Sequence, residues 1–177
     1  MSPIPLNLVL PSEIEMQKYL SQDDHGSPHI PVVIDYVVAE QSYVLFMEYP
    51  GKEWVNLNGY MTEHGKFSLN EICLIIKEVV TALLSLKNLG VAHGDIAARN
   101  ILYNKKTGGV KLMDFDLSGL LEEGNQDSSA SGSSEDEPPF WGTEKGDTRD
   151  IGEVMYHLLT LKNSYKTRSF KKMLPKN

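Results

Sequence analysis

The alternation of apolar and polar residues predicts three helices. Residues 12–20 open with Ser12 and Glu15 at the spacing of a capping box, in which each side chain accepts a backbone N–H group of the first turn. Residues 68–90 form the longest stretch with apolar residues at helical spacing, and residues 151–159 form another. The apolar positions of the long stretch are Ile72, Ile75, Ile76, Val79, Leu83 and Leu86.

Both ends of the long helix are also marked in the sequence. Ser68 and Glu71 make a second capping box, and Gly90 stands where a glycine commonly ends a helix in a left-handed conformation. We therefore expect one continuous helix between these residues.

Four shorter stretches predict strands. Residues 31–39 and 41–49 are rich in Val, Ile, Tyr and Phe and are separated only by a polar turn, which is typical of adjacent antiparallel strands. Residues 101–103 and 110–113 are short apolar runs joined by the turn-forming residues 105–109. Helices and antiparallel strands in one chain predict the α+β fold class.

The chain is expected to form one domain that carries two polar segments. Its 177 residues, 41% of them hydrophobic, suffice for one sizeable core, which we place at residues 1–161. Residues 122–139 consist mostly of Ser, Asp, Glu, Gly and Pro, which favours a disordered, solvated insertion. Residues 162–177 are expected to form a solvated basic tail.

Charge and cysteine content narrow the classes of partner and compartment. A formal net charge of −7 argues against general binding to nucleic acid or anionic membranes, because both require a surplus of Lys and Arg. The single cysteine, Cys73, lies in the apolar pattern of the long helix and is expected to be buried. Since neither a disulfide, a signal peptide nor a membrane-spanning stretch is expected, the sequence favours an intracellular protein, cytoplasmic or nuclear.

Three oxygen-bearing side chains follow the long helix within a short stretch. Asp95 comes directly after His93-Gly94, Asn100 follows it five residues later, and Asp114 ends an apolar strand. A helix, a loop and a strand hairpin in this order place the three side chains around one point. Carboxylate and amide oxygens suit Mg²⁺, and a carboxylate can receive the proton of an attacking hydroxyl. We therefore predict a phosphoryl-transfer site here.

The stretch that contains Asp95 and Asn100, with the later Asp114-Phe115-Asp116, resembles the catalytic loop and the metal-binding motif of protein kinases. This resemblance implies ATP as the nucleotide and Mg²⁺ as its metal. It implies that Asp95 is the catalytic carboxylate and that Asn100 and Asp114 bind the metal at the nucleotide site. Arg99, in the sequence Ala-Ala-Arg-Asn, resembles the tyrosine-kinase form of the loop and is expected to belong to the catalytic set.

The resemblance extends to both sides of the loop. The apolar strand that ends in Met47-Glu48-Tyr49 resembles the strand leading into the kinase hinge, which implies that these three residues contact adenine. With Pro50 they also resemble the hinge of Pim-type kinases. Asp147 stands where the large C-terminal helix of kinases begins and is expected to brace the backbone of the catalytic loop. The implied fold is protein kinase-like.

Several positions depart from the protein kinase pattern. Residues 1–17 contain neither lysine nor glycine, so the lysine that pairs with the α- and β-phosphates and the glycine-rich loop are both missing. Glu13 is the better aligned candidate for the glutamate partner of that lysine. Gly94 replaces an arginine that reads a phosphate on the activation loop, and Asp116 replaces a flexible glycine. Activation through such a phosphate is therefore not expected.

These features leave three functions open. The first is an ATP- and Mg²⁺-dependent phosphotransferase acting on protein hydroxyls, built mostly from a C-lobe (residues 50–161) with a partial N-lobe (residues 12–49). The second is a kinase-like binding or scaffold module without catalysis, which the missing lysine favours. The third is a small-molecule kinase of the aminoglycoside- or choline-kinase type, which Gly94 favours. The expected partners are a nucleotide and either a protein substrate or a protein that covers the incomplete core.

Overall fold

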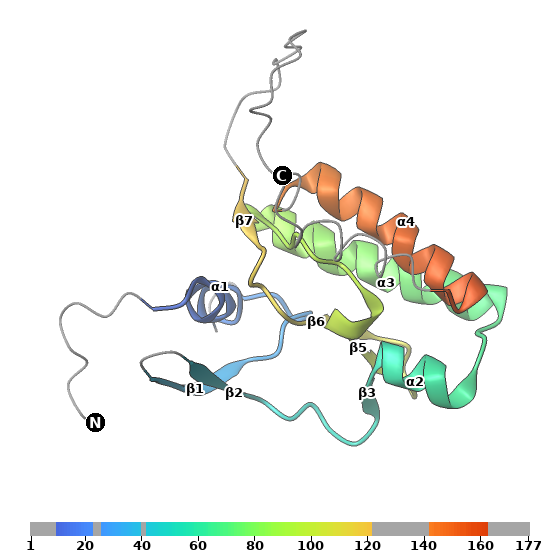
Figure 1. The fold of residues 1–177 in the computed structure, drawn as a ribbon, viewed down its shortest axis with the longest axis horizontal. Coiled ribbons are helices and arrows are strands. Elements are labelled where there is room, and N and C mark those ends of the chain that lie inside the picture. Colours follow the sequence, from blue (N-terminus) through green and yellow to red (C-terminus); the bar gives the residue numbers. More distant parts are fainter. Residues whose placement is uncertain (1–9, 23–25, 40–41, 122–141, 163–177) are drawn as a thin grey trace, which may run out of the picture.

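The computed structural model describes residues 10–22, 26–39, 42–121 and 142–162 of the chain (Figure 1). The expected insertion at residues 122–139 lies outside these ranges, and so does the expected basic tail beyond Lys162. The described residues form four α-helices and three small antiparallel sheets, which confirms the predicted α+β class.

The N-terminal part combines helix α1 (Ser12–Leu20) with a two-stranded antiparallel sheet of β1 (Val33–Val38) and β2 (Tyr43–Met47). The helix has the predicted bounds, and the strands lie within the two predicted stretches. The side-chain amide of Gln17 donates a hydrogen bond of 2.9 Å to the carbonyl of Pro31, which ties the buried face of α1 to the chain entering β1.

The predicted capping box at the start of α1 is wrong. Pro11 precedes the helix, and no side chain caps it. The carbonyl of Pro11 instead accepts the N–H groups of Ile14 at 3.0 Å and of Glu15 at 3.2 Å. Because Ser12 is already the first helical residue, its side chain is one position too late to act as the cap.

Helices α3 (Leu69–Asn88) and α4 (Glu144–Thr160) pack side by side (Figure 1). The capping box predicted for α3 is confirmed, because Ser68 and Glu71 each accept the other's backbone N–H group. Gly90 follows the helix with φ 72°, as a C-terminal glycine should.

One expectation about a helix face is wrong. Cys73 is exposed, because Ile72 and Ile75 occupy the buried face of α3 and Cys73 points away from it. On α4, Val154 and Leu158 are buried, whereas Met155 and Leu159 are partly accessible, at 42% and 37%.

Helix α4 also begins earlier than the apolar pattern indicates. Its first turn, Glu144 to Asp147, is polar, and the hydroxyl of Thr143 caps it by accepting the N–H group of Gly146 at 3.1 Å. A polar first turn leaves no apolar periodicity, so this part of the helix is visible only through its capping residue.

A three-stranded sheet lies between the N-terminal sheet and the two long helices. Its strands are β3 (Trp54–Asn56), β5 (Ile101–Asn104) and β6 (Val110–Leu112), paired in the order β3-β5-β6. The β5–β6 pair is the predicted hairpin, whereas the sequence pattern did not indicate β3. The remaining short elements are α2 (Leu57–His64), β4 (Val91–Ala92), a 3₁₀ turn (Ala98–Asn100) and β7 (Gly119–Leu120), which pairs with β4.

One hydrophobic core connects these elements. It joins the inner side of α1 to the facing sides of α3 and α4 and to the β5–β6 hairpin. No helix among the described residues is long and apolar enough to cross a membrane. The largest fully buried side chains are Phe115, Ile14, Leu20, Ile30, Leu57, Ile72, Ile75, Leu86, Ile96, Ile101, Leu112 and Leu158.

Candidate functional site

The loop between β4 and β5 carries most of the predicted site residues. It follows α3 and β4 and ends in the 3₁₀ turn that contains Arg99 and Asn100. Asp114 comes shortly after β6, the strand paired with β5. The N–H group of Met113 donates to the carbonyl of Asn100 at 2.9 Å, so the hairpin places Asp114 beside the loop.

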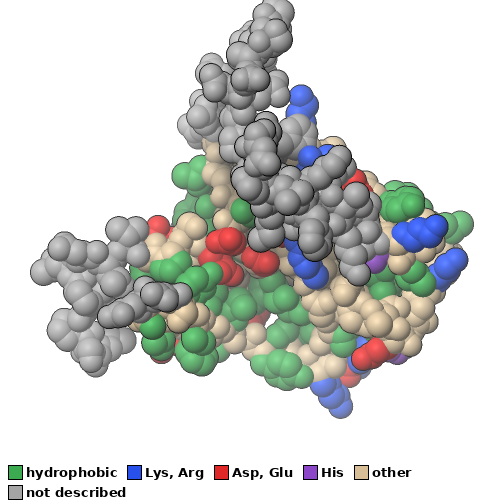
Figure 2. Space-filling model, viewed as in Figure 1, with side chains coloured by type: hydrophobic (Ala, Val, Ile, Leu, Met, Phe, Trp, Pro, Cys, Tyr) green, Lys and Arg blue, Asp and Glu red, His purple; other side chains and the backbone are tan. Residues whose placement is uncertain are grey.

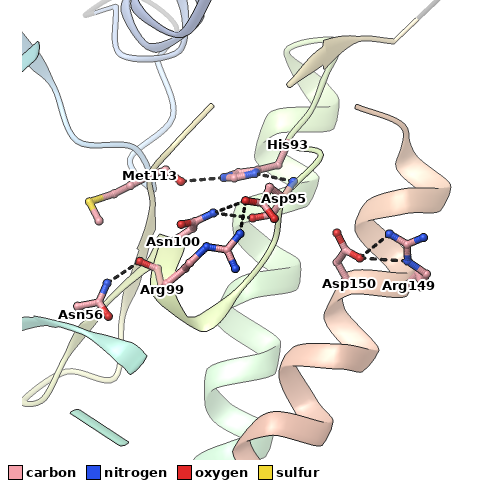
Figure 3. A network of polar contacts seen from close by, with 8 residues as sticks. All are labelled: Asn56, His93, Asp95, Arg99, Asn100, Met113, Arg149 and Asp150. Carbon is pink, nitrogen blue, oxygen red and sulfur yellow. Dashed lines mark hydrogen bonds and ion pairs between the residues drawn. The ribbon is translucent and has the colours of Figure 1, made fainter. Parts of the chain in front are cut away.

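Two loop neighbours hold the Asp95 carboxylate (Figure 3). Arg99 Nη2 donates to Asp95 Oδ2 at 2.5 Å, and Asn100 Nδ2 donates to the same oxygen at 2.9 Å and to the Asp95 carbonyl at 2.9 Å. The carbonyl of Arg99 accepts a hydrogen bond from Asn56 Nδ2, also at 2.5 Å. The structure thus brings together Asp95, Arg99 and Asn100, while their chemical roles stay predictions.

Asp114 combines an unusual backbone with a perturbed carboxyl group. Its φ is 70°, in the left-handed region that residues other than glycine seldom adopt. Burial raises the pKa of its carboxyl group, and the charges of Asp95 and Asp116 raise it further. A carboxyl group with a raised pKa on a backbone of positive φ makes Asp114 a candidate functional residue.

The oxygens at this point are of the kind that suits a magnesium ion. Because Asn100 Nδ2 is used by Asp95, Asn100 Oδ1 is the amide atom left for a cation. With the Asp114 carboxylate it would supply two oxygen ligands of the kind that Mg²⁺ takes in proteins. Among the described residues, no group of three or more His, Cys, Asp or Glu side chains is placed to hold a metal alone. Asn100 Oδ1 and the Asp114 carboxylate are therefore donors of a kind that fits Mg²⁺.

Asp147 fixes the backbone at the start of the loop, as the sequence predicts. Its Oδ2 accepts the N–H group of His93 and its Oδ1 accepts that of Gly94, both at 2.8 Å. Burial raises the pKa of this carboxyl group. His93 is fully buried, with Nε2 3.2 Å from the carbonyl of Met113 and its ring 4.6 Å from that of Phe115. His93 and Phe115 therefore pack against each other in the core.

Burial of His93 predicts a loss of stability in mild acid. It lowers the pKa of the imidazole from 6.5 to about 4, so between these values the unfolded chain binds a proton that the folded chain does not. The contribution of neutral His93 to the free energy of unfolding is complete above pH 6.5 and decreases as the pH falls toward 4. We expect His93 to account for a loss of about 1.5 kcal/mol between pH 6.5 and 5, measured by chemical denaturation across this range.

The control for this pH effect is a second histidine. His93→Gln should flatten the dependence of unfolding free energy on pH, whereas His64→Gln, at an exposed position of α2, should leave it unchanged. His157, whose pKa burial also lowers, accounts for slope that remains. Asp114 and Asp147 have raised pKa values and act in the opposite direction, equally in all variants. Equal slopes in wild type and His93→Gln would contradict the assignment.

The strand expected to contact adenine is tied to the β5–β6 hairpin. The N–H group of Glu48 donates to the carbonyl of Val32 at 2.8 Å, and Lys111 Nζ on β6 donates to Glu48 Oε1 at 2.8 Å. The hydrogen bond from Lys111 lowers the pKa of Glu48. Met47 is partly buried at the end of β2, whereas Tyr49 is 78% exposed. Sequence reasoning missed Lys111, although a charged residue in a buried strand was a visible signal.

Glu13 on α1 accepts a hydrogen bond from the hydroxyl of Tyr43 on β2. This bond, burial and the charges of Glu13, Asp116 and Asp114 together raise the pKa of Tyr43 to about 12. Acidic side chains gather in a patch on this face of the molecule (Figure 2). Nothing in the sequence singles out Tyr43, because it reads as an ordinary residue of an apolar strand.

Comparison with known proteins agrees with this geometry. The family model of the protein kinase domain matches residues 7–173. The serine/threonine-protein kinase UCNL of Arabidopsis thaliana is 31% identical over 111 residues, which cover 63% of this chain and 27% of the relative. A carbon catabolite-derepressing protein kinase of Saccharomyces cerevisiae is 26% identical over 98 residues, covering 55% of this chain and 15% of the relative. The matched region is thus less than a third of the length of either relative.

Proposed function

Because this chain belongs to the protein kinase family, whose domain model matches residues 7–173, we propose that it binds ATP with Mg²⁺ and transfers the γ-phosphoryl group to a protein hydroxyl. The observation that carries the proposal is the grouping of Asp95, Asn100 and Asp114, with Arg99 bound to Asp95. When carboxylates and amide oxygens lie close together in a partly buried site, each raises the free energy needed to ionise its neighbours. A bound cation offsets this cost.

Each residue of the group has a distinct role in this proposal. Asp95 accepts the proton of the attacking hydroxyl, and Arg99 and Asn100 orient it. Both of their hydrogen bonds fall on Asp95 Oδ2, so we assign the proton to Asp95 Oδ1. The backbone of residues 47–49 binds adenine, and the Glu48–Lys111 ion pair keeps this segment in place.

Magnesium, when bound, would neutralise the charge of the transferred phosphate. Asn100 Oδ1 and the Asp114 carboxylate are the atoms that would hold it. The raised pKa of Asp114 supports this assignment, because a neighbouring cation would stabilise its ionised form. The positive φ of Asp114 is a further cost that a bound ligand would offset.

Thermal unfolding of the full chain with ATP, with and without Mg²⁺, tests the binding step. At a concentration a hundredfold above its Kd, the nucleotide is expected to stabilise the fold by about 2.7 kcal/mol, and EDTA is expected to remove most of this gain. Asp114→Asn keeps the size of the side chain and tolerates positive φ, so it should remove only the Mg²⁺-dependent part. Asp35→Asn, at an exposed position of β1, serves as the matched control. No stabilisation of the wild type by ATP and Mg²⁺ would overturn the proposal.

A second candidate function is a kinase-like binding module without turnover. Its support is the Tyr43–Glu13 hydrogen bond, which occupies the glutamate with a neutral hydroxyl where phosphate binding would need a cation. The outer face of the β1–β2 sheet also exposes apolar side chains, with Ile34 at 69%, Val44 at 52% and Phe46 at 50%, which suits a protein partner. Nucleotide binding without γ-phosphoryl transfer to protein would favour this candidate over the first.

Two observations argue against a small-molecule kinase. The glycine at position 94 favoured that function in the sequence, but the close packing of Leu117 and Gly142 against it is a separate reason for a glycine there. The similar proteins named above are protein kinases.

We retain an intracellular location, cytoplasmic or nuclear, as part of the proposal, supported by the single free cysteine.

A further inference from the structure

Three glycines from separate segments meet beside the loop that carries Asp95. Gly94 lies in that loop, Gly119 begins β7, and Gly142 lies just before α4. A methyl group on Gly94 would overlap the carbonyl oxygen of Leu117 and would lie 2.6 Å from Gly142 N. A methyl group on Gly119 would lie 2.7 Å from Gly142 O, and one on Gly142 would lie 3.1 Å from Gly119 N. We call Gly94, Gly119 and Gly142 the glycine junction.

The atoms that exclude a side chain at the junction all belong to the backbone. A flexible side chain could rotate away from an added methyl group, but a hydrogen-bonded backbone must move as a unit. Gly94 and Gly142 also have positive φ values of 84° and 71°, which other residues seldom adopt. Gly119 is not among the positive-φ residues, so its requirement for glycine is steric alone.

Hydrogen bonds on two sides enclose the junction. On one side β7 pairs with β4, with Ala92 opposite Gly119, and the N–H group of Leu121 donates to the carbonyl of Gly90 at 2.7 Å. On the other side Asp147 accepts the N–H group of Gly94 at 2.8 Å. The junction therefore links β7 and the start of α4 to the loop residue next to Asp95.

We propose that the glycine junction is a positioning device, in which close backbone packing joins the Asp95 loop to the two segments that flank residues 122–141. In this arrangement the geometry around Asp95 depends on the absence of side chains at the three glycine positions. It does not require a charged group at position 94. The proposal concerns the chain without ligand, so it can fail or hold independently of phosphoryl transfer.

Hydrogen exchange followed by mass spectrometry, on the full chain without nucleotide, tests the junction. Gly94→Ala should speed exchange at least about tenfold in peptides that contain residues 90–96 and 117–121, because the β4–β7 pairing and the Asp147 hydrogen bonds both loosen. Gly108→Ala is the matched control, because Gly108 has φ 79° and no atom within 4 Å of an added methyl group. It introduces the same backbone strain without the contact.

Peptides from the centre of α3 separate this local effect from general destabilisation. Their exchange should stay at the wild-type rate, because α3 belongs to the main core and not to the junction. If Gly94→Ala does not fold, Gly119→Ala carries the test, since Gly119 is not among the positive-φ residues and adds the contact alone. Wild-type exchange around the junction in Gly119→Ala, or an equal rise in Gly108→Ala, would overturn the proposal.

Discussion

Asp95→Asn is expected to lower the rate of γ-phosphoryl transfer by about 10³-fold, because an amide cannot accept the proton of the attacking hydroxyl. The fold and the affinity for ATP should change little, since the new side chain has the same size and Asn100 still binds the Asp95 carbonyl. The measurement is transfer of labelled γ-phosphate to the chain itself and to casein, with ATP binding measured in parallel.

The control for this experiment is Asp35→Asn, which removes an exposed carboxylate from β1 and should keep the wild-type rate. A wild-type rate in Asp95→Asn would contradict the role assigned to this carboxylate. Binding of ATP by the wild type without any transfer would instead support the binding module proposed as the second function.

Asp147→Ala is expected to lower the free energy of unfolding by about 3–5 kcal/mol. The two backbone N–H groups that it binds, those of His93 and Gly94, lie in a buried region where water does not easily replace the lost acceptor. Urea denaturation measures the change. Asp147→Asn should show an intermediate loss, because the amide oxygen accepts one of the two hydrogen bonds and the amide nitrogen accepts none.

Glu144→Ala in the first turn of α4 is the matched control for Asp147→Ala. Glu144 forms an ion pair of 2.6 Å with Lys87, but both side chains are at least half exposed, at 59% and 50%. Such pairs contribute at most about 1 kcal/mol. If Glu144→Ala lowers the free energy of unfolding as much as Asp147→Ala does, the loss comes from the first turn of the helix. It would then not come from the hydrogen bonds of Asp147 to His93 and Gly94.

Much of the fold was predictable because its signals are local. Apolar spacing and a capping box fixed the start of α3, and two apolar runs with a glycine-containing turn identified the β5–β6 hairpin. The sequence signals failed where packing against neighbouring elements decides whether a residue is buried or exposed. Cys73 looks like a core residue in the sequence, yet the rotation of α3 that buries Ile72 and Ile75 turns it outward.

Some residues of the candidate site could likewise be predicted from the sequence, and others could not. Asp95, Asn100 and Asp114 could be found because their spacing along the chain identifies a loop followed by a hairpin. Tyr43 and Lys111 could not be assigned partners, because Glu13 and Glu48 reach them only after the sheet, α1 and the hairpin have packed together. Gly94 was read as the loss of an arginine, whereas the close approach of Leu117 and Gly142 gives glycine a steric reason of its own.

This packing also limits how the sequence can change over generations. A chain with a side chain at position 94 would have to hold Leu117 and Gly142 farther from the loop than this chain does. In this chain, a single substitution of Gly94 by a larger residue meets backbone atoms of Leu117 and of Gly142. Position 94 is therefore entrenched, because a larger residue there requires coordinated changes near Leu117 and Gly142.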